Sequence, residues 1–278
     1  MRTLTMVTRS HIISDKNLKK LMVIAKPVPK PKPQLLKTPQ PDSIFQAIGV
    51  IYADVEMDEG KASVVIGDKS YRLGYVMENQ GDSVYRLGGD AINRQTFRAL
   101  KYAITKTGKK QRLVVYPRVI HLPGRDVPHQ LTFNLLGFEG NKPREDSITK
   151  ELQDFEFRLC GLWQHIPVCK YPVVTVLRNF SDDRRSRIKD LSAVDKHKCL
   201  KASHIPISWD KPIIKPYRFN PKMDREAQGQ PAFIQMTTKF LPDNDLFEFS
   251  TLLNMPSETA PRFLKISKKD KAEALASR

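Results

Sequence analysis

Short runs of alternating apolar and polar residues recur through most of the chain after residue 42, and they predict β-strands. In the first half these runs cover residues 44–55, 62–66, 70–77, 84–87, 113–122 and 130–138. After Asp90, a good helix N-cap, the alternation gives way to a helical stripe made by Ile92, Phe97, Leu100 and Ile104. We therefore expect a β unit over residues 43–141 that contains one short helix.

The second half has a similar but less regular pattern. Residues 155–166 and 173–180 predict one hairpin, and residues 232–240 and 246–253 predict another. The charged stretch between them favours a short helix near residues 188–200. Five prolines from Pro206 to Pro231 favour a long surface loop, because proline is excluded from central strands. We expect a second β unit over residues 153–254.

Two segments that lie 112 positions apart begin in the same way. Phe45 is followed four residues later by Gly49 and two large apolar residues, and Phe157 is followed likewise by Gly161. A repeat at a domain-sized spacing favours two copies of one module. A glycine at this place suits a strongly bent first barrel strand.

In strand order, roughly residues 43 to 254 resemble the tandem OB-fold proteins that bind single-stranded nucleic acid. This resemblance implies a mainly β protein with two small OB-like β-barrels, one short helix in each, and basic flexible arms on either side. Other small β-barrels and a single large β-sandwich are the alternatives.

Both ends of the chain are basic. Residues 1–42 contain nine basic and two acidic residues, a net charge of +7, and they alternate prolines with lysines between Lys26 and Pro33. We expect such an arm to be a semi-rigid spacer. It would contact a phosphate backbone, dock a partner through its prolines, or act only as a linker. Residues 261–278 form a basic tail with six basic and two acidic residues, and we expect a frayed helix there.

The whole chain carries 47 Lys and Arg against 30 Asp and Glu, a net charge of +17, which favours a polyanionic partner. A soluble basic surface without a dedicated partner is the alternative. No run approaches the 18 or so apolar residues of a membrane span, so a membrane is not expected as a partner. Three cysteines cannot all pair within the chain, which favours an intracellular location, cytoplasmic or nucleoid-associated.

Aromatic residues interleaved with cations are what non-specific single-strand binding requires, because bases stack on rings while cations follow the phosphates. The clearest example is a proline-rich stretch with Lys211, Lys215, Tyr217, Arg218, Phe219 and Lys222. In the alternative, the aromatic side chains of Tyr217 and Phe219 pack this loop against the barrel.

Three further groups of residues are candidates for contact with nucleic acid. One is a set of three closely spaced arginines, whose guanidinium forks suit phosphate: Arg184, Arg185 and Arg187. Another shares one face of the predicted first helix: Arg94, Arg98 and Lys101. On the strand that follows, Tyr116 and Arg118 share a face, which is either a stacking surface or part of the core.

Catalytic motifs are missing from the sequence. It contains no P-loop, no dinucleotide-binding glycine pattern, no H-E-x-x-H and no Gly-x-Ser-x-Gly. A zinc site would have to use Cys160, His165, Cys169, His197, Cys199 and His204, but these lack the closely spaced C-x2-C pair of zinc knuckles. We therefore expect no metal, no cofactor and no catalytic residue.

The sequence thus predicts a non-catalytic protein that binds nucleic acid, either RNA or single-stranded DNA. One alternative is a structural subunit of a ribonucleoprotein, transposition or defence complex, with protein partners. The other is a metal-dependent nuclease.

Overall fold

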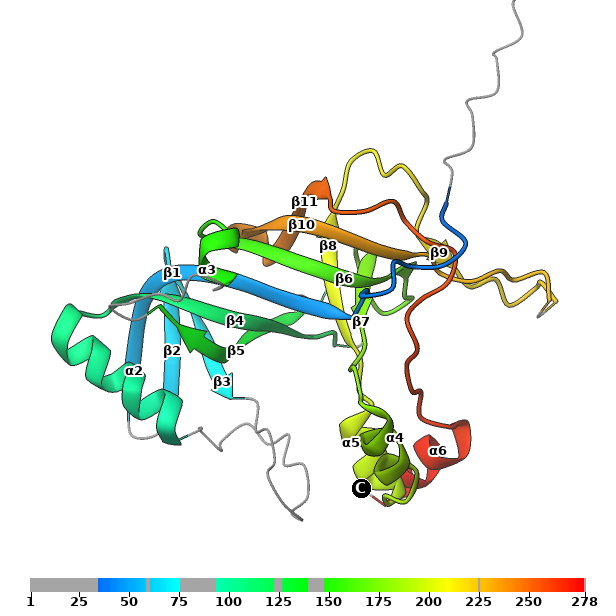
Figure 1. Ribbon diagram of the computed structural model, residues 1–278, viewed down its shortest axis with the longest axis horizontal. Coiled ribbons are helices and arrows are strands. Elements are labelled where there is room, and N and C mark those ends of the chain that lie inside the picture. The colour runs from blue at the N-terminus through cyan, green and yellow to red at the C-terminus, as the bar shows by residue number, and fades with distance from the viewer. Residues whose placement is uncertain are drawn as a thin grey trace, which may run out of the picture. The chain divides into compact units, whose positions relative to one another are not determined.

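Five strands in the first half of the chain close into a ring. The computed structural model describes residues 35–58, 61–75, 94–122, 127–139, 148–224 and 226–277. The strands are β1 (Gln46–Asp58), β2 (Lys61–Ile66), β3 (Lys69–Tyr75), β4 (Lys110–Ile120) and β5 (Gln130–Phe138) (Figure 1). Because β1 pairs with both β2 and β4, and β3 runs parallel to β5, the ring closes in the order β1-β2-β3-β5-β4. This closed barrel is compatible with an OB-like fold.

The predicted helix of the first half is α2 (Arg94–Thr107), which lies between β3 and β4 in the chain. Its apolar face is buried at Phe97 and Leu100. Gly108 follows the helix with a φ of 93°, a left-handed conformation that suits glycine. The strand predicted over residues 84–87 and the predicted cap Asp90 lie outside the described residues.

The second half repeats the strand pairing of the first. After α3 (Ile148–Glu151), its strands are β6 (Glu156–His165), β7 (Val173–Val176), β8 (Ser203–Ser208), β10 (Phe233–Leu241) and β11 (Leu246–Leu252). β6 pairs with β7 and β10, as β1 pairs with β2 and β4. β8 pairs antiparallel with β7 and parallel with β11, as β3 does with β2 and β5. A mainly β protein is confirmed, with a second ring of paired strands in the same order.

The connections of the second ring differ from those of the first and from the prediction. Two helices, α4 (Asp182–Lys189) and α5 (Ala193–Cys199), lie between β7 and β8, where one helix was expected. The end of strand β8 overlaps the start of the predicted loop, residues 206–231, and the loop also contains the short strand β9 (Tyr217–Arg218). Pro206 is accommodated in β8 opposite Val173. The predicted hairpin of β10 and β11 is confirmed, and its turn contains the 3-10 helix η1 (Pro242–Asn244).

The two rings share strand pairing and a core. β1 pairs directly with β6, from Gln46 opposite Cys160 to Gly49 opposite Phe157. One continuous cluster of buried side chains includes Phe133 of the first ring of strands and Phe157 of the second. The aromatic side chains of these two residues are stacked, with their centroids 6.1 Å apart. The predicted boundaries at 43–141 and 153–254 stay a prediction. The described residues from Leu35 onward form one compact unit.

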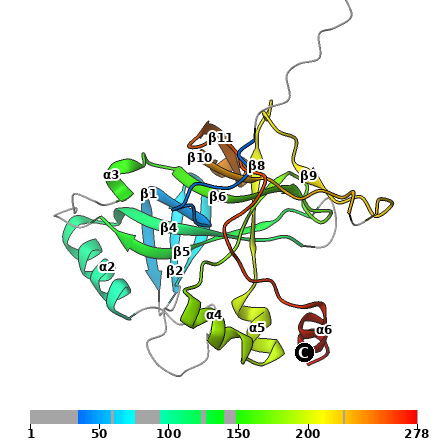
Figure 2. The same cartoon turned by 45° about the vertical axis from the view of Figure 1, so that its right-hand side comes forward.

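The segments at either end of this unit are partly packed onto it. Leu36 exchanges backbone hydrogen bonds with Pro256 and Glu258. The tail, expected to be a flexible arm with a frayed helix, contains α6 (Lys268–Ala276), whose Ala274 is buried and whose Asp270 pairs with Lys196 of α5. Figure 2 shows α4, α5 and α6 grouped together, apart from α2. The proline-rich arm up to residue 34 lies outside the described residues.

Candidate nucleic-acid interface

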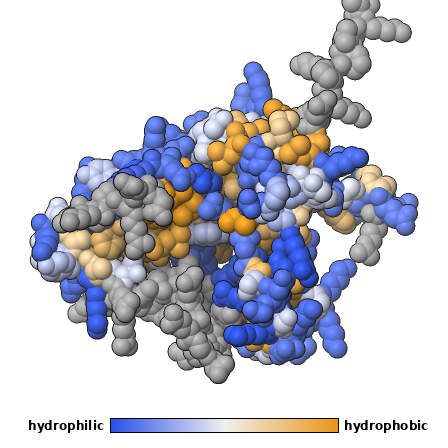
Figure 3. All heavy atoms as spheres, viewed as in Figure 1, coloured by the Kyte–Doolittle hydropathy of each residue, from blue (hydrophilic) through white to orange (hydrophobic). Residues whose placement is uncertain are grey.

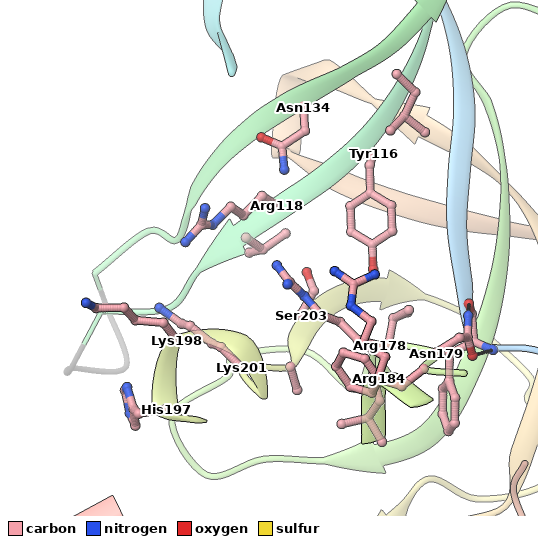
Figure 4. Close-up of a pocket in the computed structure, with 17 residues that line it drawn as sticks. Tyr116, Arg118, Asn134, Arg178, Asn179, Arg184, His197, Lys198, Lys201 and Ser203 are labelled. Carbon is pink, nitrogen blue, oxygen red and sulfur yellow. Dashed lines mark hydrogen bonds between the residues drawn. The ribbon is translucent and has the colours of Figure 1, made fainter. Parts of the chain in front are cut away.

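A cavity of about 520 Å³ lies between the outer face of the first ring and the segment that joins β7 to β8. One wall comes from β4 and β5, and the other comes from the end of β7, α4, α5 and the start of β8 (Figure 4). The polar and charged side chains that line it are Tyr116, Arg118, Asn134, Arg178, Asn179, Arg184, His197, Lys198, Lys201 and Ser203. Figure 3 shows that hydrophilic residues dominate the surface over α4, α5 and α6.

Strand geometry places Tyr116 and Arg118 in the first wall. Val115, Pro117 and Val119 of β4 point into the ring and are buried, so the alternate residues Tyr116 and Arg118 face outward. Asn134 of β5 lies directly opposite Tyr116 in the strand register. The structure therefore brings the predicted pair to one face, and that face borders the cavity.

The second wall is held in place by Asn179. Its side-chain amide donates a hydrogen bond of 2.7 Å to the carbonyl of Phe45 and accepts one of 3.0 Å from the Phe45 backbone N–H. This two-way contact fixes the chain that follows β7 against the start of β1. Arg178 and Phe180, which flank Asn179, are consequently held at the cavity.

The cavity is strongly basic. Arg118, Arg178, Arg184, Lys198 and Lys201 line it, and its described lining contains no Asp or Glu, although Lys198 also pairs with Asp195 at 3.6 Å. Neither the Arg118 nor the Arg178 side chain forms a hydrogen bond or ion pair with any residue that the structure describes. Such a group of like charges favours an anionic ligand.

Burial shifts the titration of two groups in the cavity. It lowers the pKa of Arg178, and the nearby charges of Arg184 and Arg118 lower that pKa further, against the opposing influence of Cys199 and Tyr116. Burial raises the pKa of Tyr116 to about 12, although Arg178 acts in the opposite direction. At neutral pH the guanidinium of Arg178 is charged and the phenol of Tyr116 is protonated, so the tyrosine can donate a hydrogen bond.

The three predicted arginines of α4 do not act as one cluster. Arg184 lines the cavity, with its guanidinium carbon 5.8 Å from the centre of the Phe180 ring. Arg185 instead pairs with Asp182 at 3.0 Å and donates to the carbonyl of Arg262. Arg187 is exposed. Helical geometry sends the consecutive residues Arg184 and Arg185 to different faces, which accounts for their separation.

Arg178 was not among the predicted site residues. It follows the apolar run Val173–Val176 of β7 and stands two residues before Phe180. A cation next to an aromatic residue at the end of a buried strand is the signal that could have identified it, because the same interleaving marked Tyr217, Arg218 and Phe219.

The Phe219 loop, residues 211–230 excluding Arg225, presents a second candidate surface. Its strand β9 pairs in parallel with the end of β6, Tyr217 opposite Gln164. The Phe219 side chain is 62% exposed, whereas Tyr217 is half-buried. The predicted cations of this loop are all exposed, namely Lys211, Lys215, Arg218 and Lys222.

Gln228 holds the Phe219 loop together. Its side-chain oxygen accepts hydrogen bonds from the Asn220 N–H at 3.1 Å and from the Tyr217 hydroxyl at 3.4 Å. Its amide nitrogen donates to the carbonyls of Asn220 and Met223. Phe219 is thus displayed to solvent on a turn that is internally hydrogen-bonded, as a stacking platform requires.

The basic face of α2 is not part of the cavity. Arg98 and Lys101 are exposed, and the side chain of Arg94 lies outside the described residues. No described residue of α2 lines the cavity, and Figures 1 and 2 both show the helix away from α4 and α5. The predicted cations therefore fall on at least three separate surfaces.

The cysteines and histidines considered as possible zinc ligands do not form a metal centre among the described residues. Cys160, Cys169 and Cys199 are buried free thiols. Within the described ranges, no group of three or more His, Cys, Asp or Glu side chains is arranged to hold a metal ion. Burial raises the pKa of the Cys160 thiol to about 12, although Arg158 acts in the opposite direction, so this thiol stays protonated at neutral pH.

Comparison with known proteins assigns the chain to no family. No protein-family model, curated protein or solved structure matches it. Within the described residues, no helix has the length and apolar character needed to cross a membrane. Function is therefore inferred from the geometry and charge of the cavity and of the Phe219 loop.

Proposed function

We propose that this protein binds single-stranded nucleic acid, RNA or single-stranded DNA, without catalysing a reaction. The observation that carries the proposal is the cavity, in which five cations and Tyr116 gather on a described lining without a carboxylate. Phosphate contacts supply most of the affinity of sequence-independent binding, and a cationic groove beside an aromatic ring is the arrangement that such binding uses.

The Phe219 loop supports the same proposal by a different contact. An exposed aromatic ring among four exposed cations offers a base a flat surface and its phosphates a positive field. The net charge of +17 adds long-range attraction to a polyanion. Free buried thiols suit a reducing compartment, so the proposal places the protein in the cytoplasm or nucleoid.

Binding of a labelled single-stranded 20-mer at increasing salt tests the proposal. Each neutralised phosphate contributes about −0.7 to the slope of log K against log salt for single strands, so five cavity cations predict a slope of about −3.5. Affinity should then fall about a hundredfold between about 50 and 200 mM salt. Absence of salt-sensitive binding would overturn the proposal.

Two aromatic variants refine the same experiment. Phe219→Ala should weaken binding about tenfold without changing the salt slope, because a lost stacked base costs about 1–3 kcal/mol and no charge is removed. Tyr102→Ala is the matched control, since Tyr102 of α2 is 61% exposed and lies beside Lys106. Equal losses in both variants would argue against the Phe219 loop as a stacking site.

A further inference from the structure

We infer that the cavity holds one nucleotide of the bound strand, with its phosphate on Arg178, Arg118 and Arg184 and its base against Tyr116 and Asn134. This inference rests on the proposed function and adds to it a defined subsite. The cavity would then recognise both parts of a nucleotide, and the remaining lysines would follow the neighbouring phosphates.

The phosphate position follows from the three arginines. They come from three different elements, Arg118 from β4, Arg178 from the segment after β7, and Arg184 from α4, and Figure 4 shows them around the same cavity. Arg118 and Arg178 have no carboxylate partner among the described residues. Guanidinium groups bind phosphate oxygens through parallel hydrogen bonds, so one phosphate can use several of them.

The backbone beside Arg178 is held in place before any ligand binds. The next residue, Asn179, is anchored by its two hydrogen bonds to the Phe45 backbone. Arg178 itself is half-buried, which limits the positions open to its guanidinium. A preorganised cation of this kind loses little conformational freedom when an anion arrives.

The base position follows from the other wall. Tyr116 and Asn134 lie opposite each other on β4 and β5, and Leu136 continues the same face with 44% of its surface exposed. Gly74 leaves room for the Asn134 side chain, since a Cβ there would lie 2.9 Å from the amide oxygen. The Asn134 amide forms no hydrogen bond with the described residues. An amide offers both a donor and an acceptor to the edge of a base, while the phenol ring and Leu136 offer apolar contact.

The size of the cavity fits this occupant. Its volume of about 520 Å³ falls within the range of about 300–1,000 Å³ that is typical of small-molecule sites. Phe45, Val176, Leu177, Phe180 and Ala202 supply further apolar lining. An inorganic anion alone would use the arginines and leave this apolar wall and Asn134 without a partner.

The test uses the full chain and measures calorimetric binding and thermal melting with three probes at matched ionic strength. The probes are the nucleoside 5′-monophosphates, the corresponding nucleosides and inorganic phosphate, each at up to about 10 mM, where a millimolar site is already stabilised measurably. We expect the best nucleotide to bind at least tenfold more tightly than phosphate, and nucleosides to bind more weakly than either.

Variants separate the two halves of the subsite. Arg178→Gln should abolish stabilisation by phosphate and nucleotide without lowering the melting temperature of the free protein, because it removes one of several like charges. Asn134→Ala should weaken the nucleotide about tenfold and leave phosphate unchanged. Arg187→Gln is the matched control, because this exposed arginine of α4 does not line the cavity.

Each contrary result has a distinct meaning. Equal affinity for phosphate and nucleotide would overturn the base position, and an equal effect of Arg187→Gln would overturn the phosphate position. If the 20-mer binds with the expected salt dependence but no mononucleotide binds, the subsite is wrong and the proposed function stands. If a mononucleotide binds and the 20-mer does not displace it, the ligand is a free nucleotide and the inference fails.

Discussion

The two halves of this molecule share a strand order and differ in what connects the strands. In both, the first strand pairs with the second and fourth, and the third runs parallel to the fifth. The first ring places α2 between its third and fourth strands. The second ring places α4 and α5 between its second and third strands, and the Phe219 loop between its third and fourth.

The candidate contacts lie mainly where the second ring departs from the first. The wall that carries Arg178 and Arg184 belongs to the β7–β8 connection, and Phe219 belongs to the β8–β10 connection. The first ring contributes the outer face of β4 and β5, which any ring of this kind exposes. The candidate binding features therefore lie mainly in the connections of the second ring, and connections are where small barrels that carry different functions generally differ.

The repeated Phe-x-x-x-Gly segments have a structural role at the junction of the rings. They lie in the two antiparallel strands β1 and β6, and the paired residues Ala47 and Leu159 occupy equivalent places in the two segments. The side chains do not repeat the symmetry of the backbone. Gly49 faces the ring of Phe157, whereas Gly161 faces the carbonyl of Thr175.

The largest expected effect on stability comes from substitutions that disrupt the junction of the two rings. A Cβ on Gly49 would overlap the Phe157 ring, so Gly49→Ala should cost about 3 kcal/mol in the free energy of unfolding. A Cβ on Gly161 would lie 2.5 Å from the Thr175 carbonyl oxygen and 2.8 Å from the Val174 side chain, so Gly161→Ala should cost a similar amount. Chemical denaturation measures both.

Double-mutant cycles distinguish the two glycines. Combining Gly49→Ala with Phe157→Leu should recover about 1 kcal/mol relative to the sum of the single changes, because the obstacle is a side chain. Combining Gly161→Ala with Val174→Ala should be nearly additive, because the backbone carbonyl of Thr175 remains in place. Additive behaviour at Gly49 would show that the Phe157 contact is not the obstacle.

A smaller effect should appear on acidification, at the half-buried His204, which lies where the two rings of strands meet. The Gln164 side chain donates to the Thr175 hydroxyl, which is 2.9 Å from Nδ1 of His204 and can donate to it only if His204 is neutral. Burial lowers the pKa of His204 to about 4, and the charges of His121 and Lys201 lower it further. Because the unfolded histidine titrates near 6.5, the stabilisation is complete above that pH and is lost as pH falls towards 4.

We expect this loss to reach about 2 kcal/mol, less than the full shift implies because the ring is partly accessible to solvent. Urea denaturation of the wild type and of His204→Gln from about pH 7 to pH 4 measures it. The variant keeps a neutral acceptor, so its stability should fall less steeply with acidification. Parallel curves would show that the protonation of His204 does not limit stability.

Local patterns predicted much of the fold. Alternation identified β1 to β5 and the β10–β11 hairpin, and the helical stripe with Gly108 identified α2. β8 was missed because Pro206 argued against a strand, yet the Ile207 N–H still donates to the Pro172 carbonyl. Whether a proline fits depends on which N–H groups its partner strands need, and that is set by distant residues.

The candidate site was harder to predict for the same reason. Tyr116, Arg118 and Arg184 were identified from local patterns, but their meeting with Arg178 depends on the Asn179 contact with Phe45, 134 positions away. The face on which Tyr116 lies was predictable from its strand, whereas the wall that covers that face was not. Long-range pairing of this kind has no local signature.

The most direct test compares the cavity with the other basic surface of the fold. We would measure the salt dependence of 20-mer binding for Arg118→Gln/Arg178→Gln and for Arg98→Gln/Lys101→Gln, which remove the same charge from the cavity and from α2. The account predicts that the cavity variant lowers the magnitude of the slope by about 1.4 and binds at least about tenfold more weakly at about 50 mM salt, while the α2 variant stays close to wild type. Equal losses in the two variants, or a larger loss in the α2 variant, would contradict it.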